Sequence, residues 1–253
     1  MKTISLLNLK GGVAKTTTAN NLAKGLSNIG KKVIIIDTDM QANATSIFLD
    51  NERTQDNYKS FAEALLDEKM TDLSEYTYTV TENLDMIGSK LAVADSELKI
   101  RNSFSRNSSN IVSKMLKMIS DKYDYCIIDC SPTINLITLN IINASDEIII
   151  PIKIDKFALE GYQTTMNNIN KIIDEYELDT KLKVLYTMVN RNNIDKNVIG
   201  TISAQKFETT IRFQAKPVTE SALKNTVLID SDTDSGVKDD YQNLIKEIIK
   251  ESV

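Results

Sequence analysis

The stretch NLKGGVAKTT, near the start of the chain, gathers the residues with the clearest chemical potential. It contains two lysines, Lys10 and Lys15, the adjacent glycines Gly11 and Gly12, and a run of threonines that begins at Thr16. A loop of this kind before a helix can surround an anion, because backbone N–H groups and the positive end of the helix both face the negative charge. A lysine can neutralise the same anion, and a threonine hydroxyl can bind Mg²⁺. The chemistry predicted here is the binding of a phosphate chain.

The same stretch departs from the ordinary phosphate-binding loop, whose pattern is G-x-x-x-x-G-K-[ST]. Lys15 and Thr16 supply the final two positions, but Leu9 and Ala14 stand where both glycines are expected. The two adjacent glycines lie inside the loop instead, where they let the backbone approach a phosphate closely. Lys10 stands directly before them. The pattern therefore indicates a different kind of loop, which carries an additional cation.

Carboxylates end two later apolar runs. The run KVIIIDTD ends in Asp37 and Asp39, and the run YDYCIID ends in Asp129. In a parallel sheet flanked by helices, ligands bind at the carboxyl ends of the strands, so these side chains should converge on the loop. Asp129 has the sequence context of a carboxylate that supports Mg²⁺, through water, beside a phosphate chain. The competing interpretations are an ordinary tight turn and a solvated strand end, but the combination of loop and carboxylates favours a site.

Composition excludes several classes of chemistry. The 253 residues include no histidine, which removes His-based triads, histidine general bases and HExxH zinc sites. The two cysteines, Cys126 and Cys130, cannot form a four-cysteine metal site within one chain, and we expect them to pack in the core. A net charge of −5 argues against nucleic-acid binding over the whole surface, although it allows a local basic patch. The chemistry must use carboxylates, lysines, hydroxyls, backbone amides or a bound metal.

The elements that must position these residues follow from periodicity. KTISLLNL and KVIIIDTD read as buried strands, and the segment between them has apolar residues at helical spacing, so the three form a βαβ unit around the loop. Near-continuous apolar strands are typical of a parallel sheet covered on both faces. Further strands are predicted at NLDMIGS, YDYCIIDC, DEIIIPIKI and KLKVLYTMVN, and helices at YKSFAEALLDE and at about 107–120, 133–144, 157–176 and 196–208. The fold class predicted is α/β, a doubly wound, mostly parallel sheet flanked by helices, with residues 1–253 as a single domain.

Four segments together resemble one known family. KGGVAKTT, DTDMQANAT, IIDCSP and PIKIDKFALEGYQ are similar to the deviant Walker A, switch I, Walker B and following strand of the ParA family of DNA-partitioning ATPases, within the broader group that includes MinD-like proteins. The likeness runs in register from about residue 1 to 165 and is weaker beyond. It implies the P-loop NTPase fold of the deviant Walker A type, ATP and Mg²⁺ as cofactors, and ATP hydrolysis to ADP and phosphate.

The resemblance also implies roles for individual residues. Lys10 would reach across a nucleotide-sandwich dimer to the partner's ATP, Lys15 would bind the phosphates, and Asp39 would position or activate the attacking water. Asp37 and Asp129 would support the metal together with the hydroxyl of Thr16. The residues expected to bind ATP are Lys10, Gly11, Gly12, Val13, Ala14, Lys15, Thr16, Thr17, which contacts the α-phosphate, and Asn190, which contacts adenine. Ala14 replaces the glycine that is commoner in the family, and DCSP stands where DCPP is more usual.

The expected partners follow from the same resemblance. They are a second copy of the chain when ATP is bound, duplex DNA without sequence preference, and a separate centromere-binding, ParB-like protein that stimulates hydrolysis. Arg191 and, more loosely, Arg212 and Lys216 fall near the positions of the family's DNA-binding patch. The chain begins almost directly at its first strand, so we expect no N-terminal helix-turn-helix domain and no operator binding. The expected location is cytoplasmic and associated with the nucleoid.

Three other functions remain open. One is a MinD-like positioning ATPase on a membrane, with the last helix, DDYQNLIKEIIKESV, as its anchor. The polar face of that helix mixes lysines with glutamates, whereas anionic lipid favours a basic face, so we expect the helix to dock on the core and no membrane partner. The second is a partitioning-type ATPase that positions a protein cargo. The third is a metabolic or reductase-type enzyme of the same superfamily, for which Cys126 is badly placed as a cluster ligand.

Overall fold

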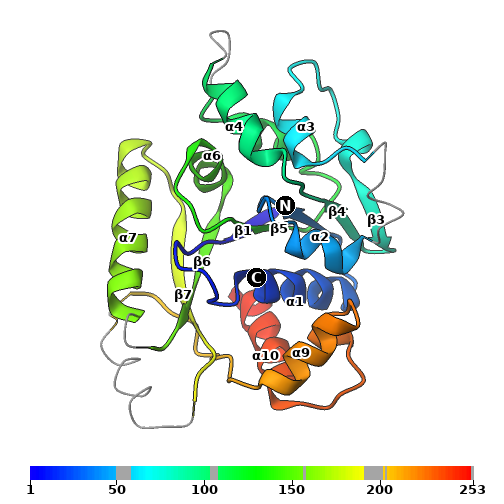
Figure 1. Cartoon of the computed structure of the whole chain (residues 1–253), viewed down its shortest axis with the longest axis vertical. Coiled ribbons are helices and arrows are strands. Elements are labelled where there is room, and N and C mark those ends of the chain that lie inside the picture. Colours follow the sequence, from blue (N-terminus) through cyan, green and yellow to red (C-terminus); the bar gives the residue numbers. More distant parts are fainter. Residues whose placement is uncertain (50–57, 103–107, 156–157, 191–201, 203, 252–253) are drawn as a thin grey trace.

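The computed structural model describes residues 1–49, 58–102, 108–155, 158–190, 202 and 204–251. Its centre is a seven-stranded sheet with the strand order β3-β4-β2-β5-β1-β6-β7 (Figure 1). All neighbouring pairs are parallel except β3 with β4, which are antiparallel. The strands are β1 (Lys2–Leu6), β2 (Val33–Asp37), β3 (Tyr78–Thr81), β4 (Leu84–Ile87), β5 (Tyr125–Asp129), β6 (Glu147–Lys153) and β7 (Lys181–Thr187). The predicted fold class, a doubly wound and mostly parallel sheet, is confirmed.

Helices cover both faces of the sheet, which explains why every residue of β2 and β5 is buried. One face packs against α1 (Lys15–Asn28), α2 (Asn43–Phe48), α9 (Ala215–Leu223) and α10 (Gly236–Glu251). The other packs against α3 (Phe61–Leu66), α4 (Val93–Arg101), α5 (Ile111–Lys117), α6 (Leu136–Ala144) and α7 (Ala158–Glu175). Two short 3₁₀ turns, η1 (Ser74–Tyr76) and η2 (Leu228–Asp230), lie in the connections.

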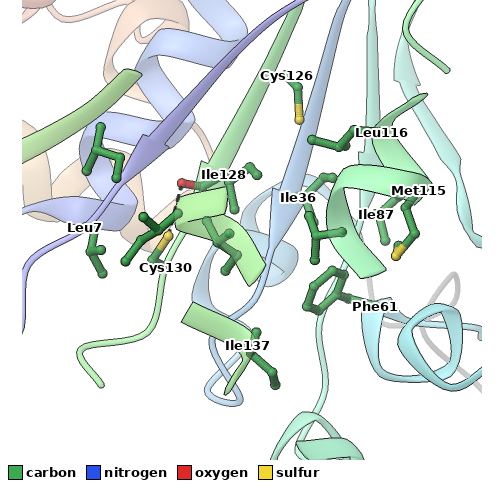
Figure 2. Close-up of a cluster of buried hydrophobic side chains, with 14 of the residues drawn as sticks. Leu7, Ile36, Phe61, Ile87, Met115, Leu116, Cys126, Ile128, Cys130 and Ile137 are labelled. Atoms are coloured by element: carbon green, nitrogen blue, oxygen red, sulfur yellow. Dashed lines mark hydrogen bonds between the residues drawn. The ribbon is translucent and has the colours of Figure 1, made fainter. Parts of the chain in front are cut away.

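Both cysteines belong to the hydrophobic cluster of the second face, as predicted. Cys126 and Cys130 are completely buried among aliphatic side chains such as Ile36, Ile128 and Leu7 (Figure 2). Burial raises the pKa of both thiols, because the thiolate loses its hydration in an apolar surrounding. Neither group is therefore suited to nucleophilic chemistry.

The last helix docks on the core, as its mixed polar face predicted. Five apolar side chains of α10 are buried, among them Tyr241, whose hydroxyl lies 3.2 Å from the Thr18 Oγ1 of α1. Gly25 permits the close crossing of α1 and α10, because a Cβ there would lie 2.1 Å from the Ile245 Cδ1. Among the helices that the structure describes, none combines the length and apolar character needed to cross a bilayer.

The helix predicted at 196–208 is wrong for its described part. Residues 202 and 204–208 are not helical, and Lys206 forms a parallel bridge with Val184 of β7. The backbone N–H groups of Val184 and Phe207 are each paired across this bridge. The physical reason is that β7 is an outer strand, whose backbone groups need partners that a helix could not supply. Sequence reasoning also missed the antiparallel β3 and the helix α4.

Candidate nucleotide-binding site

The loop between β1 and α1 presents several backbone N–H groups at the start of a helix. α1 begins at Lys15, and no described side chain caps its first N–H groups. A Cβ at Gly11 or Gly12 would meet no atom within 4 Å, so the loop opens onto free space. Gly12 and Ala14 both have left-handed backbone, with φ of 71° and 66°. The helix N-terminus therefore meets the requirements of an anion site, since its donors are free and its dipole is positive there.

The left-handed backbone at Ala14 explains why glycine is commoner at this position in the family that the motifs resemble. An L-residue in the left-handed region costs about 1–2 kcal/mol, because its Cβ approaches the carbonyl oxygen that follows. Glycine adopts the same conformation without that cost. Ala14 therefore keeps the shape of the loop at the expense of local strain, as residues at functional sites often do.

Lys15 is held inside the loop. Its side chain is largely buried, and its Nζ donates a hydrogen bond of 3.2 Å to the backbone oxygen of Lys10. Burial lowers the pKa of Lys15, while the nearby carboxylates of Asp129 and Asp39 act in the opposite direction. The ammonium therefore stands between the loop and two acidic groups, at the start of α1, where a bound phosphate chain would lie.

Asp129 is a buried carboxylate whose oxygens make no hydrogen bond of standard geometry with the described residues, although the Thr16 hydroxyl lies near them. It ends β5 with 1% of its surface exposed, and neither Oδ atom has a partner among the described residues. Burial raises the pKa of Asp129 well above its ordinary value, with the charge of Asp37 as a second cause, whereas the Thr16 hydroxyl and Lys15 oppose the shift. A buried, unsatisfied carboxylate beside a threonine hydroxyl is a donor set that Mg²⁺ prefers. The residues present thus fit the metal.

Asp37 organises the segment that follows β2. One of its oxygens accepts a hydrogen bond of 3.0 Å from the Asp39 N–H, and the other accepts bonds from the Thr45 N–H (2.9 Å) and the Thr45 hydroxyl (2.8 Å). Burial raises the pKa of Asp37 to about 6, and the bonds from Thr45 limit the rise. Both oxygens of Asp37 accept hydrogen bonds within the protein, so Asp37 holds this segment in place. Any support that it gives to a metal would come from this hydrogen-bonded position.

Asp39 lies in a different environment. It is only partly buried, and one oxygen accepts a hydrogen bond of 3.0 Å from the Gln41 N–H. Asp39 lines a cavity of about 270 Å³ between this segment and the loop Ser131–Pro132–Thr133 after β5. Its carboxylate is therefore accessible from a cavity, as the position of a group that orients water requires.

Lys10, the additional lysine, is paired within its own chain. Its Nζ lies 2.7 Å and 2.6 Å from the two carboxylate oxygens of Asp155, just beyond β6. Its backbone N–H donates to the Oδ1 of Asn8. In this single chain the ammonium of Lys10 is therefore engaged by Asp155.

An apolar cavity lies on the other side of the loop. It measures about 240 Å³ and is lined by Ala14 and Thr17 of the loop and helix, by Met188 after β7, by residues 211–215, 218 and 219, and by Val237 and Tyr241 of α10. Met188 adopts left-handed backbone with φ of 53°, another strained residue at the site. Asn190 follows two residues later and is exposed. A mainly apolar slot beside a phosphate-binding loop suits a flat base.

The three residues expected to contact DNA lie in different environments or outside the described residues. Arg191 lies outside the described residues. Arg212 donates from its Nε and one terminal nitrogen to the two oxygens of Asp240, at 2.7 Å each, and its guanidinium packs against Gly236. Lys216 is 85% exposed and lies 3.9 Å from Glu220. Arg212 thus connects the strand-like segment after β7 to α10, whereas Lys216 presents its charge to solvent.

Comparisons with known proteins show the family to which the chain belongs. A family model described as an AAA domain matches residues 1–184. The chain is 34% identical over 203 residues to the sporulation initiation inhibitor protein Soj of Bacillus subtilis, covering 79% of this chain and 78% of that protein. It is 32% identical over 222 residues to the chromosome partitioning protein ParA of Myxococcus xanthus, covering 82% and 74%. A plasmid partition protein from Borrelia burgdorferi, solved with AMPPNP bound, superposes with a TM-score of 0.83 at 26% identity, over 99% of both chains.

The solved structure shares the overall fold of this chain, and the names of the relatives agree with the resemblance seen in the sequence motifs. This chain belongs to the ParA family of partitioning ATPases.

Proposed function

We propose that the chain, acting as a single domain, binds ATP and Mg²⁺, dimerises on ATP, binds DNA without sequence preference and hydrolyses ATP when a centromere-binding partner stimulates it. The observation that carries this proposal is the buried, unpartnered carboxylate of Asp129 beside Lys15 and the uncapped start of α1. An anion would satisfy the N–H groups and the lysine, and a divalent cation would satisfy the carboxylate. A nucleoside triphosphate bound to Mg²⁺ supplies both.

In this proposal the N–H groups of residues 11–16 surround the phosphates and Lys15 neutralises them. Thr16 and Asp129 hold Mg²⁺, which would neutralise developing charge on the phosphates, and Asp37 keeps Asp39 in place. Thr17 contacts the α-phosphate, and the apolar cavity with Met188 and Phe213 receives adenine. Asn190, two residues after Met188, is the proposed polar contact to the base. Asp39 orients the attacking water and accepts hydrogen bonds from it.

Lys10 acts on the nucleotide of a second copy, which requires that it leave Asp155. Lys10→Ala should keep ATP binding within about threefold of the wild type, because Lys15 remains in the loop. Hydrolysis and ATP-dependent dimerisation should be lost, since a cation supplied in trans to the transferred phosphoryl group is worth about 10³–10⁵-fold in rate. Calorimetry, phosphate release and size-exclusion chromatography test the three properties separately. Hydrolysis by Lys10→Ala at the wild-type rate would contradict the proposal that Lys10 acts on the nucleotide of the second copy.

DNA binding falls to Arg191, Lys216 and, in part, Arg212, whose pairing with Asp240 leaves fewer free donors. The ATP-bound protein should bind unrelated duplexes with comparable affinity, because phosphates and not bases are contacted. Affinity should fall steeply between 50 and 200 mM salt, roughly 10–100-fold for a few phosphate contacts per dimer. Lys216→Ala should weaken binding equally for all sequences.

The deciding experiment is sedimentation of the protein with DNA or with anionic liposomes, in ATP and in ADP. Pelleting with DNA in ATP alone supports the proposal. Pelleting with liposomes would support membrane positioning, against the burial of α10 in the core. Pelleting with neither, in a protein that still dimerises and hydrolyses ATP, would favour a protein cargo. A preference for one duplex, or binding that salt does not weaken, contradicts the proposed DNA contact.

A further inference from the structure

Asn8, which precedes the loop, is buried, and its side chain takes part in three hydrogen bonds. Its Oδ1 accepts bonds from the Lys10 N–H (2.9 Å) and from the Thr165 hydroxyl (3.1 Å), and its Nδ2 donates to the Pro151 oxygen (2.7 Å). Asn8 is 2% exposed and Thr165 is 0% exposed. The side chain of Asn8 thus ties the entry of the loop to β6 and to α7, two elements that lie more than 140 residues away in the sequence.

Thr165 is the contribution of α7 to this network. Its hydroxyl donates to Asn8 and also accepts a long bond, 3.4 Å, from the Leu9 N–H. The hydroxyl therefore touches both residues that precede Lys10 in the chain. A polar side chain buried on a helix is retained where it satisfies other buried groups, because an unpaired group in that environment is costly.

The side chain of Lys10 meets the same part of the molecule. Its ammonium bonds to Asp155, between β6 and α7, and a Cβ added to Gly161 of α7 would lie 3.6 Å from the Lys10 Cδ. The backbone of Lys10 is therefore linked through Asn8 to Pro151 and Thr165. Its side chain lies against Gly161, and its ammonium is paired with Asp155. The segment 151–165, and not only the loop, decides where the lysine stands.

We propose that Thr165 is a positioning residue for Lys10, acting through Asn8. The proposal rests on the function proposed above, in which Lys10 contributes to hydrolysis in a second copy. The hydroxyl fixes the backbone that precedes the two glycines. When Lys10 leaves Asp155 to reach the second copy, its side chain therefore starts from a fixed backbone position. Without the hydroxyl, Asn8 keeps its bond to Pro151 but loses the one to α7, and the loop entry gains freedom. Geometry at the reacting phosphate is sensitive to such a change, since a misplacement of about 1 Å can cost about 100-fold in rate.

The test compares Thr165→Val, which keeps the shape and removes the hydroxyl, with Thr165→Ser, which keeps the hydroxyl. Thr164→Val, at an exposed neighbour on α7, is the matched control. Thr165→Val should lower kcat about tenfold or more and leave the affinity for ATP within about threefold, because Lys15 and the helix N-terminus bind the phosphates. Thr165→Ser and Thr164→Val should stay near the wild type.

Hydrogen exchange of the peptide that contains Leu9 and Lys10, in the protein without nucleotide, is the readout independent of hydrolysis. Thr165→Val should speed exchange there, and Thr165→Ser should restore protection. Unchanged exchange and unchanged kcat in Thr165→Val would overturn the inference, as would equal losses in both variants, which would show a packing role. If the wild type itself does not hydrolyse ATP, the proposed function fails, and exchange alone still decides whether Thr165 fixes the loop.

Discussion

Replacing Lys15 with alanine should abolish measurable ATP binding. The lysine is buried, and its charge faces the carboxylates of Asp129 and Asp39. Without it, a triphosphate would meet two acidic groups in a poorly solvated place, with the N–H groups of α1 as the remaining donors. Removing one partner of a buried ionic contact costs about 3–5 kcal/mol, which corresponds to roughly 10²–10⁴-fold in affinity. Titration calorimetry with ATP and Mg²⁺ measures the loss.

The matched control is Lys32→Ala, which removes the same charge from an exposed position before β2. Its affinity for ATP should equal that of the wild type, and it should unfold near the wild-type urea midpoint, because exposed substitutions change stability by about 0.5 kcal/mol or less. A folded Lys15→Ala protein that binds ATP normally would mean that the loop does not hold the phosphates. The assignment of the nucleotide site would then be lost, although the fold would stand.

The parts of this site that were predictable from sequence are those in which the chemistry is local. Lys15 and Thr16 are adjacent, and the strands that end in Asp37 and Asp129 are continuous apolar runs, so their common sheet edge follows from the parallel topology. The docking of α10 was predictable for the same reason, because one stripe of a helix carries its apolar residues.

What could not be predicted depends on contacts between distant segments. The pairing of Lys10 with Asp155 joins residues that are 145 positions apart, and no local pattern records it. The apolar cavity combines Met188 with Phe213 and Val218, and the strand-like pairing at Lys206 exists because β7 is an outer strand. A local apolar pattern does not distinguish that pairing from a helix, because tertiary contacts override propensity. The commitment of Arg212 to Asp240 is of the same kind.

Asp39→Ala should produce a protein that binds ATP, dimerises and no longer turns over. The wild-type side chain is only partly buried, and in the structure it accepts a hydrogen bond from the Gln41 N–H while Asp37 separately holds Thr45 and the Asp39 N–H. The substitution therefore removes the accessible carboxylate and leaves the hydrogen bonds that Asp37 makes to this segment. Lys10, Lys15 and Thr16 remain to hold the nucleotide.

The chain has no histidine, so a carboxylate is the favoured group to orient and polarise water at this site, and Asp39 is the best placed. Loss of such a group costs about 10²–10⁴-fold in rate. Basal hydrolysis and its stimulation by a partner should disappear together, because both need the same positioned water, and the ATP-bound dimer should persist on DNA.

Size-exclusion chromatography in ATP, run beside a phosphate-release assay, separates the outcomes for Asp39→Ala. Asp121→Ala removes an exposed acidic residue elsewhere and should behave as the wild type in both assays. A dimer without phosphate release identifies Asp39 as the group that orients water. A monomer in ATP would instead make Asp39 part of the switch that senses the nucleotide, since the segment it belongs to connects β2 to α2. Normal turnover would leave Asp39 without a role in orienting the attacking water.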